Sequence, residues 1–183
     1  MFQTILVAVD GTRQANRALA SATALAKSQN ATLHILHVID EMTMRVMLDP
    51  TGIGVADYIQ ESLKHLNELA RKVIADAEKA AKKAVRHVDA RIISSRGRTV
   101  ADVILGYARK IGADVIVLGT HGRRGIGRLL MGSDAESVLR NATVPVLLVR
   151  SPDVKRAVKR KRAVEPARAK RRSEKRTLAA ATV

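Results

Sequence analysis

Short apolar runs alternate with longer segments of helical periodicity over the first 150 residues of the chain. Five such runs, at residues 4–9, 32–38, 89–94, 115–118 and 144–149, have the length and the branched side chains of buried strands. Strands separated by helices form right-handed βαβ units, in which neighbouring strands run parallel and helices cover the sheet. The pattern therefore predicts an α/β fold, with a five-stranded parallel open sheet and helices on both faces.

Apolar residues at intervals of three and four mark the expected helices. Residues 13–29 carry the first stripe, and Thr12 is its expected N-cap because its hydroxyl can accept from the first helical turn. A loop containing methionine, glycine and proline is expected at residues 41–54, and further helices at 100–110 and from Ser133. The long helix after the loop has one stripe, formed by Ile59, Leu63, Leu66, Ala70, Val73, Ile74 and Ala77.

The net charge of +16 is concentrated at the C-terminal end of the chain. Residues 151–183 hold 12 Lys or Arg against 3 Asp or Glu, a net of +9, and few large apolar side chains. Such a segment cannot bury enough apolar surface to offset the entropy lost on ordering. We therefore predict a globular domain over residues 1–150 and a basic, disordered tail over residues 151–183.

The composition excludes several classes of protein. The chain has no cysteine, which excludes disulfides, thiolate catalysis and cysteine-ligated metal centres. No apolar run approaches the roughly 18–20 residues of a membrane span. The N-terminus enters a strand directly, without a basic segment or a cleavage site. We expect a cytoplasmic protein that does not associate with membranes.

A glycine-rich segment follows the apolar run at 115–118 and leads into the helix expected from Ser133. Its spacing is Gly119-x2-Gly122-x9-Gly132-Ser133. Glycines let the main chain approach a phosphate closely, and the first N–H groups of a helix lack partners within it. The Ser133 hydroxyl could cap the helix or donate to a phosphate oxygen. The segment favours an anion site, although a structural turn after a strand has a similar composition.

Three segments lie at the carboxyl ends of expected strands: Asp10, Ile39-Asp40 and the loop that begins at Gly119. Ligands of parallel sheets bind beyond these ends, where the strand order changes direction. We therefore expect the three segments to meet at one crevice. Asp10 has two readings, a turn residue before Gly11 or a ligand contact, and its position opposite the glycine loop favours the second.

These segments resemble the universal stress protein family, and in particular its ATP-binding branch. The resemblance covers about residues 1–150 and is carried by residues 5–12, 36–40, 113–122, 132–133 and 144–149. The glycine–serine spacing is the family's ATP-binding signature. The resemblance implies a Rossmann-like, adenine nucleotide alpha hydrolase-like fold and a nucleotide-dependent switch in the stress response. It implies ATP as the ligand, with any Mg²⁺ or Mn²⁺ bound through the phosphates.

The resemblance also implies the residues of the site. The expected nucleotide-binding set is Ala8, Val9, Asp10, Val38, Leu118, Gly119, Gly122, Gly132, Ser133 and Asp134. Asp10 would contact the ribose and Val38 the adenine, with the two residues before Asp10 lining the base pocket. The first two glycines would hold the ribose–phosphate region. The last three members would bind the phosphates, Asp134 through its amide.

The sequence shows no catalytic or metal-binding arrangement. The histidines do not have the spacing of metal ligands, and His34 and His37, three apart on a strand, are expected to point to opposite faces of the sheet. Arg123, Arg124 and Arg128 could neutralise triphosphate charge or could form a solvated loop. We expect a sensor or switch with at most slow ATP hydrolysis rather than a fast enzyme.

Two expectations concern macromolecular partners. The apolar edge strand from Val144 to Val149 can pair with its own copy, and the resemblance implies the same homodimer. The alternative function is electrostatic binding of nucleic acid or another polyanion by the tail, which contains no Phe, Tyr or Trp on which bases could stack.

A third class of function, that of the ATP-pyrophosphatase-type enzymes, would need a Ser-Gly-Gly-x-Asp-Ser-like loop after the first strand, which this chain lacks.

Overall fold

Strands and helices alternate along the chain, as predicted. The computed structural model describes residues 1–41, 55–120 and 131–150, and for residues 55–59 it describes the backbone alone. The elements, in chain order, are β1 (Thr4–Ala8), α1 (Arg13–Gln29), β2 (Thr32–Ile39), α3 (Val55–Lys82), β3 (Val88–Ser94), α4 (Val100–Ile111), β4 (Val115–Gly119), α5 (Ser133–Asn141) and β5 (Val146–Val149). They belong to one compact unit, Met1–Arg150.

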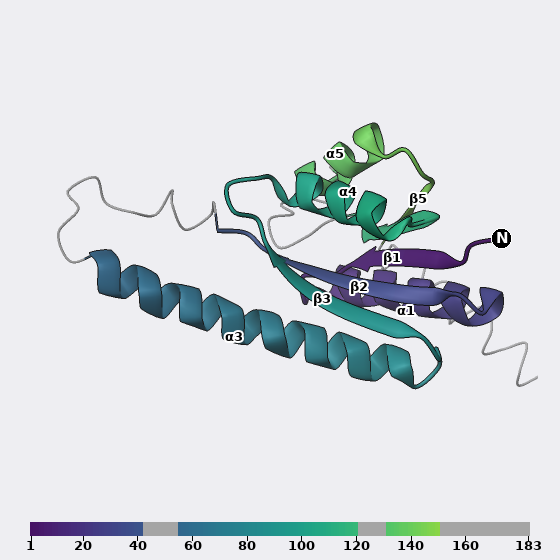
Figure 1. The fold of residues 1–183 in the computed structure, drawn as a ribbon, viewed down its shortest axis with the longest axis horizontal. Helices are drawn as coiled ribbons and strands as arrows, with labels where there is room; N and C mark the ends of the chain where they lie inside the picture. Colours follow the sequence, from purple (N-terminus) through teal and green to yellow (C-terminus); the bar gives the residue numbers. More distant parts are fainter. Residues whose placement is uncertain (42–54, 121–130, 151–183) are drawn as a thin grey trace, which may run out of the picture. The chain divides into compact units, whose positions relative to one another are not determined.

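The five strands form one parallel sheet in the order β3-β2-β1-β4-β5. After β1, the chain adds β2 and then β3 on one side of β1. It then returns to the other side of β1 and adds β4 and then β5. Because βαβ crossovers are right-handed, this reversal moves the connecting helices to the other face. Figure 1 accordingly shows α1 and α3 on one side of the sheet and α4 and α5 on the other. The predicted α/β fold is therefore confirmed.

Alternating side chains of the central strands form two hydrophobic cores. One core joins the sheet to α1 and α3 and includes Ile5, Val7, Leu33, Ile35, Val115 and Val117. The other joins the sheet to α4 and α5 and includes Leu6, Leu36, Ile116 and Leu118. Each fully buried large aliphatic side chain contributes about 1.5–3 kcal/mol of transfer free energy. The burial therefore stabilises the sheet on both faces, next to the site expected at the ends of its strands.

The long helix α3 is buried along only part of its length. Its predicted stripe is buried at Ala70, Ile74 and Ala77, whereas Leu63 and Leu66 nearer its N-terminus are half-buried. Figure 1 shows that the N-terminal half of α3 extends beyond the ends of β2 and β3. The side chain of Ile59, the first member of the stripe, lies outside the described part of the chain.

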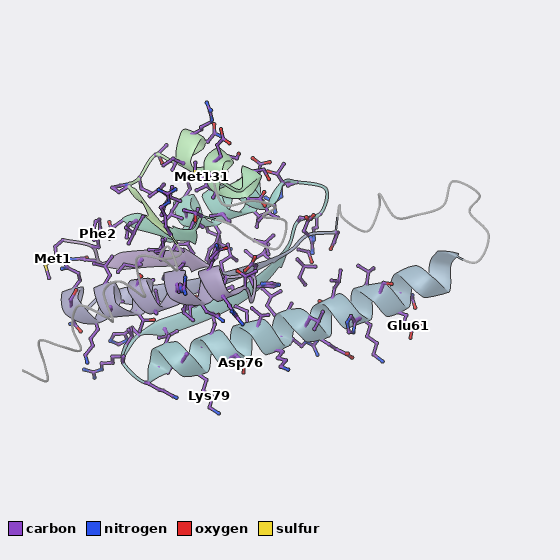
Figure 2. All side chains as sticks on the ribbon, turned by 180° about the vertical axis from the view of Figure 1, so that it is seen from behind. Met1, Phe2, Glu61, Asp76, Lys79 and Met131 are labelled. Atoms are coloured by element: carbon purple, nitrogen blue, oxygen red, sulfur yellow. The ribbon has the colours of Figure 1, made fainter. Side chains whose placement is uncertain are left out.

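The outer side of α3 is charged. Figure 2 shows the side chains of Glu61 and Lys79 pointing away from the sheet, and Lys82 forms an ion pair with Glu78 at 2.7 Å.

In the part of the chain that the structure describes, no helix combines the length and the apolar character that crossing a membrane requires.

Side-chain caps define the starts of two helices. The Thr12 hydroxyl accepts a hydrogen bond from the Ala15 N–H at 3.2 Å, which confirms Thr12 as the N-cap of α1. Thr99 and Asp102 form a capping box at the start of α4. Hydrogen bonds from the Thr99 hydroxyl and backbone hold the pKa of the Asp102 carboxyl below its usual range.

Each of the five strands differs from its predicted range by one or two residues at one end. β5 begins at Val146 rather than Val144, since Pro145 has no N–H to donate, although the Pro145 carbonyl accepts from the Ile116 N–H at 3.0 Å. β1 ends before Val9, whose N–H still donates to a carbonyl of β2 at 2.8 Å.

Candidate functional site

The carboxyl ends of β2, β1 and β4 lie side by side because β1 is the central strand of the three. The register pairs Ala8 with Leu36, so two residues further along Asp10 is level with Val38. On the other side of β1, Gly119 ends β4. The segments expected to share a crevice therefore follow neighbouring strands, at the point where the strand order changes direction.

Asp10 is held in place by the residue that caps α1. One of its carboxylate oxygens, Oδ1, accepts from the backbone N–H of Thr12 at 2.9 Å and from the Thr12 hydroxyl at 2.7 Å. The interpretation of Asp10 as a turn residue is therefore correct for its Oδ1 atom. The same bonds fix the carboxylate at the carboxyl end of the central strand, where a ligand contact was predicted.

The turn between Asp10 and Thr12 requires a glycine. Gly11 has φ +83°, a left-handed conformation that side chains disfavour. A Cβ atom on Gly11 would also lie 2.9 Å from Cγ2 of Val73. Helix α3 therefore packs directly on the turn that carries Asp10.

A buried histidine joins the ends of β1 and β2. His37 is 4% exposed, and its Nδ1 lies 2.7 Å from the carbonyl oxygen of Val9. His34 lies on the opposite face of β2, as predicted, with its ring edge-on to that of Tyr107 and its Nδ1 3.4 Å from a carboxylate oxygen of Asp89. Sequence reasoning excluded metal binding by His37 but did not find this structural role.

The residues expected around the base divide between the two faces of the sheet. Ala8 and Val38 are half-buried and border the core beneath α4, whereas Val9 is 4% exposed in the core beneath α1. The Val9 side chain is therefore part of the core, and its carbonyl faces β2. Leu118, at the end of β4, is also a core residue, 5% exposed beneath α4.

The two ends of the glycine-rich segment are joined by a hydrogen bond. The Gly132 N–H donates to the Thr120 carbonyl at 2.9 Å, and the Thr120 N–H donates to the Val149 carbonyl at 3.2 Å. These bonds place the start of α5 directly beside the end of β4. Residues 121–130 lie outside the described part of the chain, and with them the predicted site residue Gly122 and the candidates Arg123, Arg124 and Arg128.

Helix α5 begins without a side-chain cap. Its N-cap is Gly132, which has no side chain with which to form a capping hydrogen bond. Ser133 is exposed and is the first helical residue, so the expectation that its hydroxyl could cap this helix is wrong. Asp134 and Glu136 place acidic groups in the first turn, which stabilises the helix dipole. Glu136 pairs with Arg140 at 2.8 Å.

Ser95 is a buried polar residue that sequence reasoning missed. It is 0% exposed, and its N–H donates to the Ile39 carbonyl at 2.9 Å. Its hydroxyl accepts from the Glu41 N–H at 3.2 Å, and its carbonyl accepts from the Arg98 N–H at 3.0 Å. Ser95 thereby fixes the chain as it leaves β2, beside Asp40. A serine after a strand has no distinctive sequence signal, because its partners come from a different strand.

The described residues contain no cluster of metal ligands, and a cavity that they line lies away from Asp10. Among residues 1–41, 55–120 and 131–150, no group of three or more His, Asp or Glu side chains could hold a metal ion. A cavity of about 130 Å³ lies at the other end of the strands, where Gly112 and Ala113 precede β4 and Thr143 and Val144 precede β5. Its lining is mostly apolar, and it is remote from Asp10.

Known proteins share both the sequence and the fold of this chain. The model of the universal stress protein family matches residues 1–150. A universal stress protein of Thermus aquaticus, encoded 3' of a QAH/OAS sulfhydrylase, is 38% identical over 150 residues, which cover 82% of this chain and all of the relative.

Two solved structures illustrate the likeness in fold. The structure of hypothetical protein MJ0577 is 25% identical and superposes with a TM-score of 0.70, covering 84% of this chain and 99% of the other. The crystal structure of a universal stress protein in complex with cAMP has a TM-score of 0.59 at 24% identity, over 82% of this chain and 99% of the other. On the family match and the Thermus relative, the chain belongs to the universal stress protein family.

Proposed function

We infer that this chain binds ATP where β1, β2 and β4 end, and that it acts as a cytoplasmic, nucleotide-dependent switch in the stress response. The observation that carries the proposal is the hydrogen bond from Gly132 to Thr120. It places the uncapped start of α5 beside the end of β4, which is next to the strand that presents Asp10. A polar anchor and a helix N-terminus thus lie at the same ends of neighbouring strands.

The nucleoside half of the proposed site lies at β1 and β2. A ribose hydroxyl donates well to a carboxylate, and the Asp10 carboxylate is already oriented by Thr12. Val38, level with Asp10 on the next strand, supplies backbone and apolar surface for adenine, together with Ala8 and the backbone of Val9. The solved universal stress protein that holds cAMP supports an adenine nucleotide as the class of ligand.

The phosphate half of the proposed site lies at the start of α5. The N-cap Gly132 has no side chain, so a phosphate can approach the backbone closely there, and the N-terminal end of the helix dipole favours an anion beside the amides of Ser133 and Asp134. The residues present fit a phosphate group for this reason. Leu118, Gly119 and Gly122 complete the proposed set, and any Mg²⁺ or Mn²⁺ enters with the phosphates. The proposal assigns no catalytic residue and at most slow hydrolysis of ATP.

Two proposals concern partners. Leu147 is 41% exposed on β5, at an edge of the sheet, and we infer that the edge pairs with a second copy to form a homodimer. The alternative function, binding of nucleic acid by the basic residues 151–183, is favoured by their net charge of +9.

The nucleotide content of the purified protein tests the proposed function. Freshly purified full-length protein is denatured, and the released nucleotides are separated by chromatography. Protein freed of nucleotide is then titrated with ATP in a calorimeter, with GTP as the control ligand. We expect an adenine nucleotide to co-purify and ATP to bind more tightly than GTP. A chain that neither retains an adenine nucleotide nor binds added ATP would refute the proposal.

A further inference from the structure

The bond between His37 and Val9 joins two strands at the proposed nucleotide site. The backbone pairing of β1 and β2 runs from Thr4 and Thr32 to Ala8 and Leu36. The next residue of β1, Val9, donates its N–H to the Leu36 carbonyl at 2.8 Å. Its carbonyl then accepts from a side chain, the imidazole of His37, at 2.7 Å. The ring thus continues the connection between the two strands where the ladder ends.

The chemistry of this contact assigns the tautomer of His37. A carbonyl oxygen can only accept, so the Nδ1 atom that lies 2.7 Å from it must carry the proton. A ring that is 4% exposed needs such a partner, because an unsatisfied polar group costs free energy when it is buried. An apolar side chain would fill the same core position without this requirement. The imidazole therefore supplies the Val9 carbonyl with a donor that an apolar side chain would not provide.

Peptide geometry carries the effect of His37 to Asp10. The carbonyl of Val9 and the N–H of Asp10 belong to one peptide unit, which is trans and planar, so the two groups point in opposite directions. With the carbonyl turned toward β2, the Asp10 N–H is turned toward the side of β1 on which β4 and Gly119 lie. The planar peptide also fixes the position of the Asp10 Cα relative to the Val9 carbonyl.

We propose that His37 is a positioning residue for the nucleotide site, which sets the direction of Asp10 by holding the Val9–Asp10 peptide. This inference rests on the proposed function and deepens it. Thr12 donates to the Asp10 carboxylate, and His37 donates to the carbonyl of the Val9–Asp10 peptide. Asp10 is therefore oriented by two side chains, neither of which needs to touch the ligand.

A pair of substitutions separates positioning from packing. In His37→Asn the amide nitrogen occupies nearly the same position as Nδ1 and can still donate to the Val9 carbonyl, whereas His37→Leu fills the core without a donor. His34→Leu is the matched control, since His34 lies on the other face of the same strand. Each full-length variant is first shown to unfold cooperatively, and His37→Phe replaces the leucine variant if the latter does not fold. ATP affinity is then measured by calorimetry.

We expect His37→Leu to weaken ATP binding about tenfold or more, while His37→Asn stays within about threefold of the wild type. The control His34→Leu should bind like the wild type. A donor-free variant that binds ATP as tightly as the wild type would overturn the proposal, as would an asparagine variant that is as weak as the leucine variant.

NMR tests the proposal without a nucleotide. Long-range ¹H–¹⁵N spectra of the wild type should show Nδ1 of His37 protonated, and the Asp10 amide resonance should move in His37→Leu more than in His37→Asn. An unprotonated Nδ1, or an Asp10 resonance indifferent to the donor, would refute the positioning of Asp10. If the wild type binds no adenine nucleotide, the proposed function fails, and these spectra alone decide whether His37 orients the peptide.

Discussion

A Cβ atom on Gly119 would lie 3.2 Å from the backbone carbonyl carbon of Gln14 and 3.3 Å from its carbonyl oxygen. The end of β4 and the first turn of α1 are thus in contact backbone to backbone. The first glycine of the proposed phosphate loop therefore has a packing function of its own, which is to let α1 approach the sheet beside Asp10. A ligand role for Gly119 must be separated from this one.

Gly119→Ala should destabilise the domain by about 1–3 kcal/mol, because the added methyl group meets backbone that cannot move without shifting α1. Chemical denaturation measures the change. The control is Gly106→Ala on α4, where a Cβ atom meets nothing within 4 Å, and where alanine should add up to about 1 kcal/mol by helix propensity. A Gly119→Ala protein as stable as the wild type would contradict the close approach to Gln14.

Asp10→Ala should lower ATP affinity about 5- to 150-fold, because it removes the expected acceptor for the ribose. It also removes the acceptor of both Thr12 bonds, so Thr12→Val is needed as the comparison. That change deletes the N-cap hydroxyl and should cost about 1 kcal/mol of stability, with a much smaller loss of ATP affinity. Equal affinity losses in the two variants would show that Asp10 acts through the turn alone.

The stability of the domain should depend on the ionisation of Asp114. Its Oδ2 accepts from the backbone N–H of Gln3 at 2.7 Å and of Thr4 at 2.8 Å. The bonds from Thr4 and then Gln3 hold the pKa of the Asp114 carboxyl below its usual range. Since the pKa is lower in the folded state, the stabilisation is complete above the ordinary value of about 3.9 and is lost as the pH falls through the folded value.

Asp114→Asn should therefore lower the unfolding free energy by about 1 kcal/mol at neutral pH, a modest figure because the site is open to solvent. The difference from the wild type should shrink as the pH falls below about 4. Urea denaturation across pH measures it. Asp76→Asn, on the exposed side of α3 (Figure 2), is the matched control for the loss of a surface carboxylate. A constant deficit for Asp114→Asn down to low pH would contradict the assignment.

Leu148→Pro should weaken self-association. Thr120 donates to the carbonyl of Val149, and alternate residues of a strand direct their backbone groups to opposite sides. The N–H of Leu148 therefore faces the open edge of the sheet, and proline at this position removes a donor from the edge without breaking the bonds to β4. Sedimentation at micromolar concentrations should show a wild-type dimer and a dissociated variant. A wild-type monomer under these conditions would refute pairing through β5.

A chain that ends at Arg150 should keep the ATP affinity of the full-length protein, because every proposed nucleotide contact precedes that residue. The full-length chain, but not the truncated one, should bind duplex DNA with steep salt dependence. If about six tail charges contact phosphates, the logarithm of the binding constant should fall with that of the salt concentration at a slope near −5. Equal DNA binding by both chains would place the basic site on residues 1–150, and its absence from both would leave a solubilising or protein-binding role for the tail.

Local patterns determined most of the fold. The period of the apolar residues predicted every strand within two residues and the existence and order of the helices, since burial on one or both faces repeats with the geometry of the element. Thr12 was predicted as the N-cap because a cap bonds within its own first turn. Asp10, Asp40 and Gly119 were predicted to lie near one another because parallel strands have their carboxyl ends at the same end of the sheet.

Contacts between segments distant in sequence were decided only by the tertiary structure. The imidazole of His37 reaches Val9, 28 residues away, and Gln14 meets Gly119 from the other half of the chain. Neither contact can be predicted from the local sequence, because neither repeats along a helix or strand. Whether an aspartate, a glycine or a histidine at a strand end shapes a site depends on which strand lies next to it, and that order exists only once the sheet has assembled.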